Sequence, residues 1–329
     1  MKILHVSDGG LPDPRVERMA MTMRKQGHEM VFIGGHRIGG QHLSAFSSAV
    51  TIPLGIGPSI VHDPRVKKRW IKAIKDVDPD IVHAHNVVVG HFLLETNYPV
   101  VFDDHENLSA QKFIFMARPF LRKTAARFLV RKFPDWEQQM AEKYPVLTVS
   151  EGISNYYRKF TTNIGVVINV PFLSEVEWIE NPATRSGLVY MGGDFSWPRF
   201  IPTRDMTGLR DILEFDVVAG LPHKEMMSKL STYKIGLTPY KLHPFHLISN
   251  PNKNYEYLHA GLQVVLNENF THLFEGNPYI HQFKSYDDIR DVVDSVPSVD
   301  GMKIMEFARE HYIWDHYEHI VHEAYEKAL

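Results

Sequence analysis

Apolar strand-like runs alternate with an amphipathic helical stretch at the start of the chain, and this alternation constrains the fold more than any other feature. We expect a strand over Lys2–Ser7, a turn over Asp8–Pro14, an amphipathic helix over Arg15–Gln26 and a second strand over Met30–Gly34. A strand, a turn, a helix and a strand in this order begin a doubly wound parallel sheet. The sequence therefore predicts an α/β fold.

Glycine and polar residues follow several of the expected strands. Gly9 and Gly10 lie in the first turn, where glycine lets the backbone approach a ligand closely. Residues 80–86 form an expected strand that ends in polar residues, and residues 99–107 run from a buried strand into the charged cluster around His105. Sheets of this kind keep their chemistry at the carboxyl ends of the strands. We therefore expect a functional site at these strand ends.

Length and composition describe a globular chain with room for two domains. The chain has 329 residues, of which 44% are hydrophobic and 23% charged. It has no cysteine, which excludes disulfides, thiolate metal sites and cysteine nucleophiles. No run approaches the roughly 18 apolar residues that span a bilayer, and the first residues form a strand rather than a signal peptide. We expect a cytoplasmic protein.

The stretch from His243 to Glu268 predicts a loop, a short helix, a tight turn and a buried strand. A helix begun by Asn250 or Asn252 points free backbone N–H groups at an anion such as a diphosphate, and Lys253 adds a positive charge. Glu256, one turn later, could accept hydrogen bonds from a ribose diol. Ordinary caps and solvated side chains explain the same residues equally well.

The string SNPNKNYEYLHAGLQVV resembles the donor-binding segment of family 4 retaining glycosyltransferases of the GT-B fold. It is similar to the branch with the pattern S-x-P-N-K-x-x-E-Y-x-x-A-G-x-P-V-V. The resemblance implies that Glu256 holds the nucleotide ribose, and that the loop with Asn252 and Lys253 faces the diphosphate and the donor sugar. Many members carry a second glutamate eight positions before the first, where this chain has Ile248.

Two further segments resemble the same family. Asp103-Asp104-His105-Glu106 is similar to its D-x-H-E element, which implies that His105 faces the donor sugar and is catalytic. The string DPRVER resembles the D-x-R-V start of the first helix, so Arg15 and Glu106 are candidates for the acceptor side. A structural histidine and a surface arginine are the alternative interpretations.

The resemblance also implies two doubly wound Rossmann-like domains that face each other across a cleft. We expect an acceptor-side domain at residues 1–168, a nucleotide-sugar domain at 169–311 and a helix at 312–329 that crosses back. Gly192 and Gly193 follow the expected strand Leu188–Met191 and are donor-binding candidates. Arg199 is the candidate for the arginine and lysine that family members place after these glycines. The second domain is shorter than is usual in the family.

Residues 112–133 are basic, amphipathic and aromatic. Such a helix can lie on an anionic membrane surface, whereas aromatics in a core with a solvated basic face are the alternative. Residues 1–170 carry 22 Lys and Arg against 16 Asp and Glu, and residues 171–329 carry 14 against 23. Only the first half is thus expected to meet an anionic partner; a nucleic-acid groove is not favoured. The basic residues are Lys112, Arg118, Arg122, Lys123, Arg127, Arg131 and Lys132.

By resemblance, the expected reaction is transfer of a hexose from a nucleotide diphosphate sugar, with UDP or GDP, to an acceptor hydroxyl with retention. A lipid-linked glycan or glycolipid is the expected acceptor, and the enzyme would be peripheral on the inner membrane face. We expect no metal and no cofactor, although His83 and His85 share one face of a strand. A catalytically silent nucleotide-sugar- or glycan-binding GT-B protein and a GT-B nucleotide-sugar epimerase stay open as alternatives.

Overall fold

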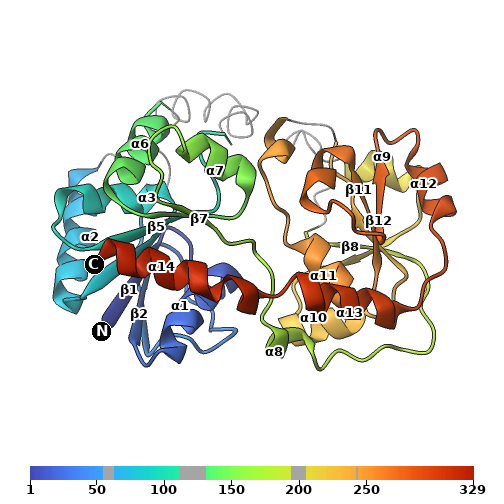
Figure 1. The fold of residues 1–329 in the computed structure, drawn as a ribbon, viewed down its shortest axis with the longest axis horizontal. Helices are drawn as coiled ribbons and strands as arrows, with labels where there is room; N and C mark the ends of the chain where they lie inside the picture. The colour runs from blue at the N-terminus through green and yellow to red at the C-terminus, as the bar shows by residue number, and fades with distance from the viewer. Residues whose placement is uncertain (55–62, 111–130, 194–204, 242–243) are drawn as a thin grey trace. The chain divides into compact units, whose positions relative to one another are not determined.

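The computed structural model describes residues 1–54, 63–110, 131–193, 205–241 and 244–329 (Figure 1). The chain divides into two compact units. Unit 1 contains Met1–Ile168 and Tyr317–Leu329, and unit 2 contains Asn169–His316. Each unit is built on its own parallel sheet, which confirms the predicted α/β class.

Unit 1 has a seven-stranded sheet within the described residues, with the order β3-β2-β1-β4-β5-β6-β7 and parallel pairing throughout. Parallel sheets are covered on both faces, and accordingly every residue of β4 and β5 is buried. The strands are β1 Lys2–Ser7, β2 Glu29–Gly34, β3 Ser48–Thr51, β4 Ile81–His85, β5 Val100–Asp104, β6 Val146–Thr148 and β7 Ile164–Val166.

Helices cover both faces of this sheet. On one face lie α1 and the C-terminal helix α14, which contact each other, and α14 also contacts β5, β6 and β7. On the other face α3 packs against β1 and β4, with α6 beside it. The helices of unit 1 are α1 Pro14–Lys25, α2 Pro64–Val77, α3 Val87–Gly90, η2 His91–Glu95, α6 Phe133–Lys143, α7 Glu151–Tyr157 and α14 Glu318–Ala328.

Helix α1 begins one residue earlier than expected because of its cap. The side chain of Asp13 accepts hydrogen bonds from the backbone N–H groups of Arg15 and Val16, and Pro14 occupies the first helical position. An aspartate cap followed by proline is a favourable helix start, since proline lacks only an N–H group that would be unbonded there. This start places Arg15 in the first turn, beside the ends of the central strands.

Unit 2 has a five-stranded parallel sheet within the described residues, with the order β12-β11-β10-β8-β9. Its strands are β8 Leu188–Met191, β9 Asp216–Val218, β10 Ile235–Thr238, β11 Gln263–Asn267 and β12 Ile280–Phe283. Its helices are α8 Leu173–Val176, α9 Met206–Arg210, α10 His223–Leu230, η3 Pro244–Leu247, α11 Lys253–His259, η4 Glu268–Leu273, α12 Ile289–Ser295 and α13 Gly301–His311.

Helix α11 is fixed on the sheet of unit 2 by a buried tyrosine. The Tyr257 hydroxyl accepts from the Met191 backbone N–H at 2.6 Å and donates to the Leu237 carbonyl at 3.1 Å. Its ring lies directly over Gly236, where any side chain would collide with it. The start of α11 is thereby held at the carboxyl ends of β8 and β10.

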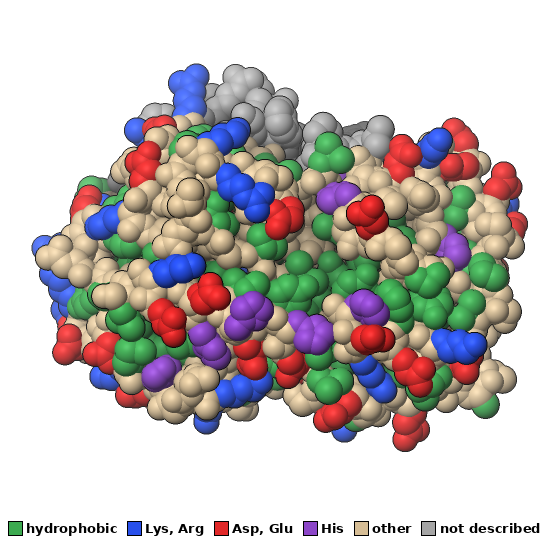
Figure 2. Space-filling model, in the orientation of Figure 1, with side chains coloured by type: hydrophobic (Ala, Val, Ile, Leu, Met, Phe, Trp, Pro, Cys, Tyr) green, Lys and Arg blue, Asp and Glu red, His purple; other side chains and the backbone are tan. Residues whose placement is uncertain are grey.

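The C-terminal residues form two elements rather than the single expected helix. Trp314–Tyr317 is a 3₁₀ turn, η5, and Trp314 is fully buried against Phe172. Helix α14 then buries Val321, Ala324 and Tyr325. Its outer face carries charged residues and histidines, and histidines are visible on the face shown in Figure 2. No helix within the described residues is long and apolar enough to span a membrane.

Candidate active site

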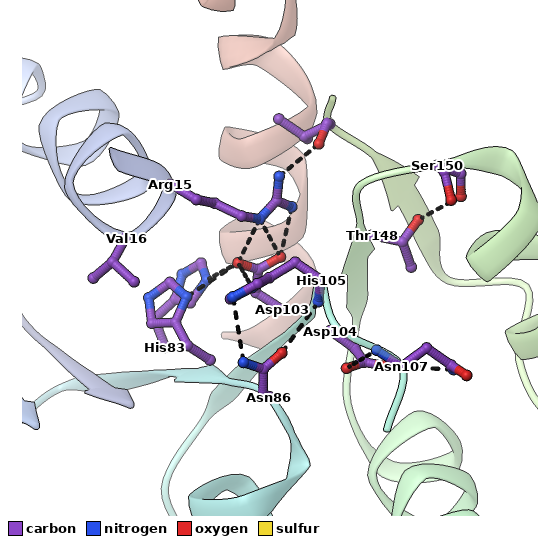
Figure 3. Close-up of polar contacts among 12 residues, drawn as sticks. Arg15, Val16, His83, Asn86, Asp103, Asp104, His105, Asn107, Thr148 and Ser150 are labelled. Carbon is purple, nitrogen blue, oxygen red and sulfur yellow. Dashed lines mark hydrogen bonds and ion pairs between the residues drawn. The ribbon is translucent and has the colours of Figure 1, made fainter. Parts of the chain in front are cut away.

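The carboxyl ends of β1, β4 and β5 bring buried polar side chains together in unit 1 (Figure 3). His5 pairs with His83 in the strand register, and His85 pairs with Asp103. Paired residues of neighbouring strands point to the same face of a sheet, so these four side chains share one face. All four are fully buried.

Asp103 is the centre of this group. Arg15 donates to its carboxylate through Nε, 2.9 Å from Oδ2, and through Nη2, 2.6 Å from Oδ1. His85 Nδ1 lies 3.0 Å from Oδ2, and His105 Nδ1 lies 3.3 Å from the same atom. The remaining Arg15 nitrogen, Nη1, donates to the Val167 carbonyl at 2.7 Å. The two-pronged contact with arginine is the strong form of an ion pair.

Burial and charge give the buried groups fixed ionisation states. Burial alone would raise the pKa of Asp103, but Arg15 and the histidine hydrogen bonds hold that pKa well below its ordinary value. Burial lowers the pKa of His5 and His83, and burial together with His83 lowers the pKa of His85 to about 3. At neutral pH Asp103 is therefore an anion, and these three histidines are neutral.

His105 lies at the accessible edge of the group, with 13% of its side chain exposed. Burial lowers its pKa, but the hydrogen bond to Asp103 and the Asp103 charge outweigh burial and raise that pKa to about 9. Its ring Nε2 faces the Asn86 amide nitrogen at 3.3 Å, and its backbone N–H donates to Asn86 Oδ1 at 3.3 Å. His105 is therefore the histidine of this group that carries a positive charge at neutral pH.

Asp8 follows β1 and stands near His105. Burial raises the pKa of Asp8 above its ordinary value, although His105 and a hydrogen bond from Asn86 act in the opposite direction. Oδ1 of Asp8 is buried and has no hydrogen-bond partner among the described residues. Glu106 is exposed, and its charge is close enough to raise the pKa of Asp8. A hydroxyl group that entered here would find Asp8 ready to accept a hydrogen bond.

Arg15 and Gly10, two site residues that were predicted in unit 1, have surroundings that the sequence did not indicate. Arg15 is 1% exposed and bound to Asp103, so it is neither a surface residue nor directed at an acceptor. Gly10 has no room for a side chain because the Arg37 carbonyl lies against it. Packing against Arg37 therefore explains why residue 10 is a glycine, without a bound ligand. Gly9 donates its backbone N–H to the Ser7 hydroxyl at 3.0 Å.

A second group of predicted residues meets in unit 2. Lys253 is 7% exposed, and its Nζ lies 4.2 Å from the centre of the Tyr190 ring and 5.1 Å from that of Tyr240. A side-chain carbon built on Gly192 would lie 3.4 Å from the same Nζ. The ammonium group thus stands beside the backbone that follows β8, held by two aromatic rings.

Glu256 lies one turn after Lys253 on α11 and is 4% exposed. His223 Nε2, at the start of α10, is 3.8 Å from Glu256 Oε1. Asn252 precedes the helix in a helical conformation and makes no side-chain cap. The alternative that Asn252 is an ordinary side-chain cap is therefore wrong. Gly193 is exposed, immediately after Gly192.

Several predicted residues lie outside the described part of the chain. They are Arg199 of the donor group and Lys112, Arg118, Arg122, Lys123 and Arg127 of the basic segment. Arg131 and Lys132, the last basic residues of that segment, precede α6. The roles of these residues stay predictions.

Asp103 is a potential third metal ligand beside His83 and His85, which the sequence did not reveal. The arrangement does not suit a metal ion. The carboxylate of Asp103 is already bound by Arg15 on both oxygens, and His85 Nδ1 already lies in hydrogen-bond contact with Oδ2 at 3.0 Å, so the ligand atoms that a metal ion needs are occupied. The absence of a metal requirement stays a prediction.

No role was predicted from the sequence for His5, Asp103, Tyr190 or Tyr240. Tyr190 and Tyr240 end or follow strands that were predicted, so their positions at the carboxyl ends of β8 and β10 were a usable signal. His5 lies between two apolar residues of β1, and Asp103 follows the apolar run Val100–Phe102 of β5, a strand that is buried throughout. Polar residues within such strands are the signal that could have found the cluster.

Comparisons with known proteins identify the architecture. Residues 15–168, which lie within unit 1, match the model of Glycosyltransferase Family 4. No match to a curated protein sequence was found. The chain is similar in structure to a sucrose-phosphate synthase from Thermosynechococcus elongatus, with a TM-score of 0.70 and 11% identity over 99% of this chain and 98% of the other.

Two other similar structures contain UDP. One is Anabaena Alr3699/HepE in complex with UDP, with a TM-score of 0.61 and 10% identity over 99% of this chain and 100% of the other. The second is Arabidopsis thaliana UGT89C1 complexed with UDP, with a TM-score of 0.57 and 11% identity over the full length of both chains. The chain therefore has the GT-B glycosyltransferase fold, and its residues 15–168 match Glycosyltransferase Family 4.

Proposed function

We propose that the protein is a retaining, metal-independent glycosyltransferase that moves a hexose from a nucleotide diphosphate sugar to an acceptor hydroxyl. The observation that carries this proposal is the meeting of Lys253, Gly192 and Glu256 in unit 2. All three belong to the segments that resemble donor-binding elements. The family match of residues 15–168 and the UDP held by two similar structures support transfer from a nucleotide sugar.

Lys253 and Glu256 suit the two halves of a nucleoside diphosphate. Lys253 places a cation beside the backbone of Gly192, where φ is +136° and the absent side chain leaves the peptide accessible. A diphosphate leaving group needs positive charge as its bond to the sugar breaks, and Lys253 with nearby backbone N–H groups supplies it without a metal ion. Glu256, as a carboxylate, accepts two hydrogen bonds from a ribose diol.

His105 is the proposed catalytic residue of unit 1. As an imidazolium it is a strong donor, and such a donor stabilises negative charge on sugar or phosphate oxygens in the transition state. Asp8 lies near His105, and its Oδ1 has no hydrogen-bond partner among the described residues. We therefore propose that Asp8 accepts a hydrogen bond from a hydroxyl of the sugar that His105 contacts. No carboxylate is assigned as a nucleophile, so the leaving phosphate is proposed to assist attack from its own face, which retains the configuration.

Loss of the Glu256 carboxylate tests the donor assignment. Glu256→Ala is expected to weaken binding of the preferred UDP- or GDP-sugar by about 1–3 kcal/mol, or roughly 5- to 150-fold in Kd, through lost charged hydrogen bonds. Isothermal calorimetry with the exposed variant Glu275→Ala as the control measures this effect. Equal affinity in Glu256→Ala and wild type would remove Glu256 from the donor site.

A lipid-linked glycan or glycolipid is the proposed acceptor, in a setting at the inner membrane surface. Support comes from the sequence of residues 112–133, with seven basic residues and no acidic ones. The protein should co-sediment with anionic liposomes at low salt and be released at high salt. Failure to bind anionic liposomes at low salt would remove the membrane setting and leave the transferase proposal intact.

A further inference from the structure

His105 is attached to the rest of the site through Asp103. The Nδ1 atom of His105 lies 3.3 Å from Asp103 Oδ2, and the ring is partly exposed while Asp103 is fully buried. The carboxylate is itself fixed on both oxygens, by Arg15 and by His85. A fixed anion behind a partly exposed imidazole limits the ring to one orientation and favours the proton on Nδ1.

The rest of the histidine group fixes the same carboxylate from behind. His85 donates to Asp103 with Nδ1, so its Nε2 accepts from His5 Nδ1 at 2.9 Å. His83 Nδ1 lies 2.7 Å from the Tyr325 hydroxyl, and its Nε2 faces Asp103 Oδ2 at 3.9 Å. The three rings stack, with centroid separations of 4.5 to 5.1 Å. These three neutral rings pack beside Asp103, which is fully buried from water.

We propose that Asp103 is the positioning residue for His105: it accepts a hydrogen bond from Nδ1–H and so fixes the orientation of the imidazole. Its charge also favours a second proton on the ring, which Nε2 can donate to substrate once substrate replaces the Asn86 amide nitrogen that faces Nε2. The orienting role rests on the contacts of Asp103 alone. Its value for catalysis rests on the proposed glycosyl transfer, in which His105 stabilises negative charge.

The charge on His105 follows from every ionisable group that faces it. Asp103 and Asp13 favour the cationic ring, whereas Arg15 disfavours it. Asp8 and Asp104 interact with the same charge, and the repulsion from His105 helps to keep His83 and His85 neutral. Since the carboxylate of Asp103 is the group in hydrogen-bond contact with Nδ1, its removal should change the titration of His105 most.

The test combines a titration of His105 with turnover. In protein labelled with ¹³C-histidine, the His105 signal is assigned by its absence in His105→Ala, and wild-type His105 should lose its proton at about pH 9. In Asp103→Asn the same signal should titrate at or below the ordinary value of about 6.5. Turnover at pH 7.5 should fall on the order of 10²-fold, because the ring is misplaced and uncharged.

Tyr325→Phe is the matched control. It removes a buried hydroxyl from the same cluster that bonds His83 and not Asp103, so the titration of His105 should stay as in wild type. Identical titration of His105 in Asp103→Asn and wild type would overturn the proposal. If Asp103→Asn does not fold, wild-type protein decides alone: an ordinary pKa for His105, or a neutral ring protonated on Nε2, contradicts it. Wild-type protein without transferase activity would defeat the proposed function and leave the titration result standing.

Discussion

Replacement of Arg15 by methionine is expected to lower the free energy of unfolding by about 3–5 kcal/mol. Methionine fills a similar volume but leaves the Asp103 carboxylate buried without its main counter-charge. The ion pair is 2.6 Å long, and the two side chains are 2% and 0% exposed. A buried charge that loses its partner keeps its desolvation cost, which explains the size of the effect.

Urea denaturation measures the loss of unfolding free energy in Arg15→Met and in the control variant Lys25→Met. Lys25 lies on the same helix and pairs with Glu318 at 2.8 Å, but it is 44% exposed, so its loss should cost no more than about 1 kcal/mol. A similar small loss in both variants would contradict the account of Asp103.

The pH dependence of stability provides a second test of the Arg15–Asp103 ion pair. The pKa of Asp103 in the folded protein lies below its ordinary value, so its ionisation stabilises the fold at neutral pH. This stabilisation is lost as the pH falls through that lowered pKa. Without Arg15 the pKa of Asp103 rises, and the carboxyl is protonated more readily in the fold. The stability difference between Arg15→Met and wild type should therefore become smaller as the pH falls from the higher pKa of Asp103 in the variant to its lowered pKa in wild type.

Removal of the His105 side chain is expected to have the largest effect on activity. His105→Ala should lower turnover on the order of 10²–10³-fold, the usual loss when one donor to a developing negative charge is removed. Donor affinity should change little, because the proposed donor contacts lie on Lys253 and Glu256. Turnover and Kd are measured on the same preparation.

The control for His105→Ala is His319→Ala, an exposed histidine on the outer face of α14. It should keep wild-type turnover. If His105→Ala also kept wild-type turnover, His105 would have no part in catalysis, and the cationic ring beside Asp103 would be a structural ion pair. A large rise in donor Kd would instead place His105 among the binding residues.

Much of the fold was predictable because its strands are short apolar runs buried on both faces. Leu188–Met191 was predicted with the bounds that the structure shows, and the strands at residues 81–85 and 100–104 were placed within a few residues. Strand β12, Ile280–Phe283, was missed. Its residues alternate irregularly and are mostly half-exposed, so it carries a weak apolar signal at the edge of its sheet.

The site was predictable where a local motif holds its residues together, and not where strand pairing does. His105 and Glu256 each stand in a short string with a recognisable pattern. The contact between Arg15 and Asp103 joins residues 88 positions apart. It depends on β4 pairing with both β1, which precedes the helix of Arg15, and β5, which carries Asp103. A single sequence shows no such pairing, so Arg15 was assigned to an acceptor instead of an ion pair.

Donor turnover without added metal is the most direct measurement of the central claim. Wild-type protein is incubated with a panel of UDP-, GDP- and ADP-sugars in the presence of a chelator, and release of the nucleoside diphosphate is followed with Glu256→Ala and His105→Ala in parallel. We expect slow release from one donor, weakened binding in Glu256→Ala and slower release in His105→Ala. Binding of no nucleotide sugar, or release that returns only with Mg²⁺ or Mn²⁺, would contradict the central claim.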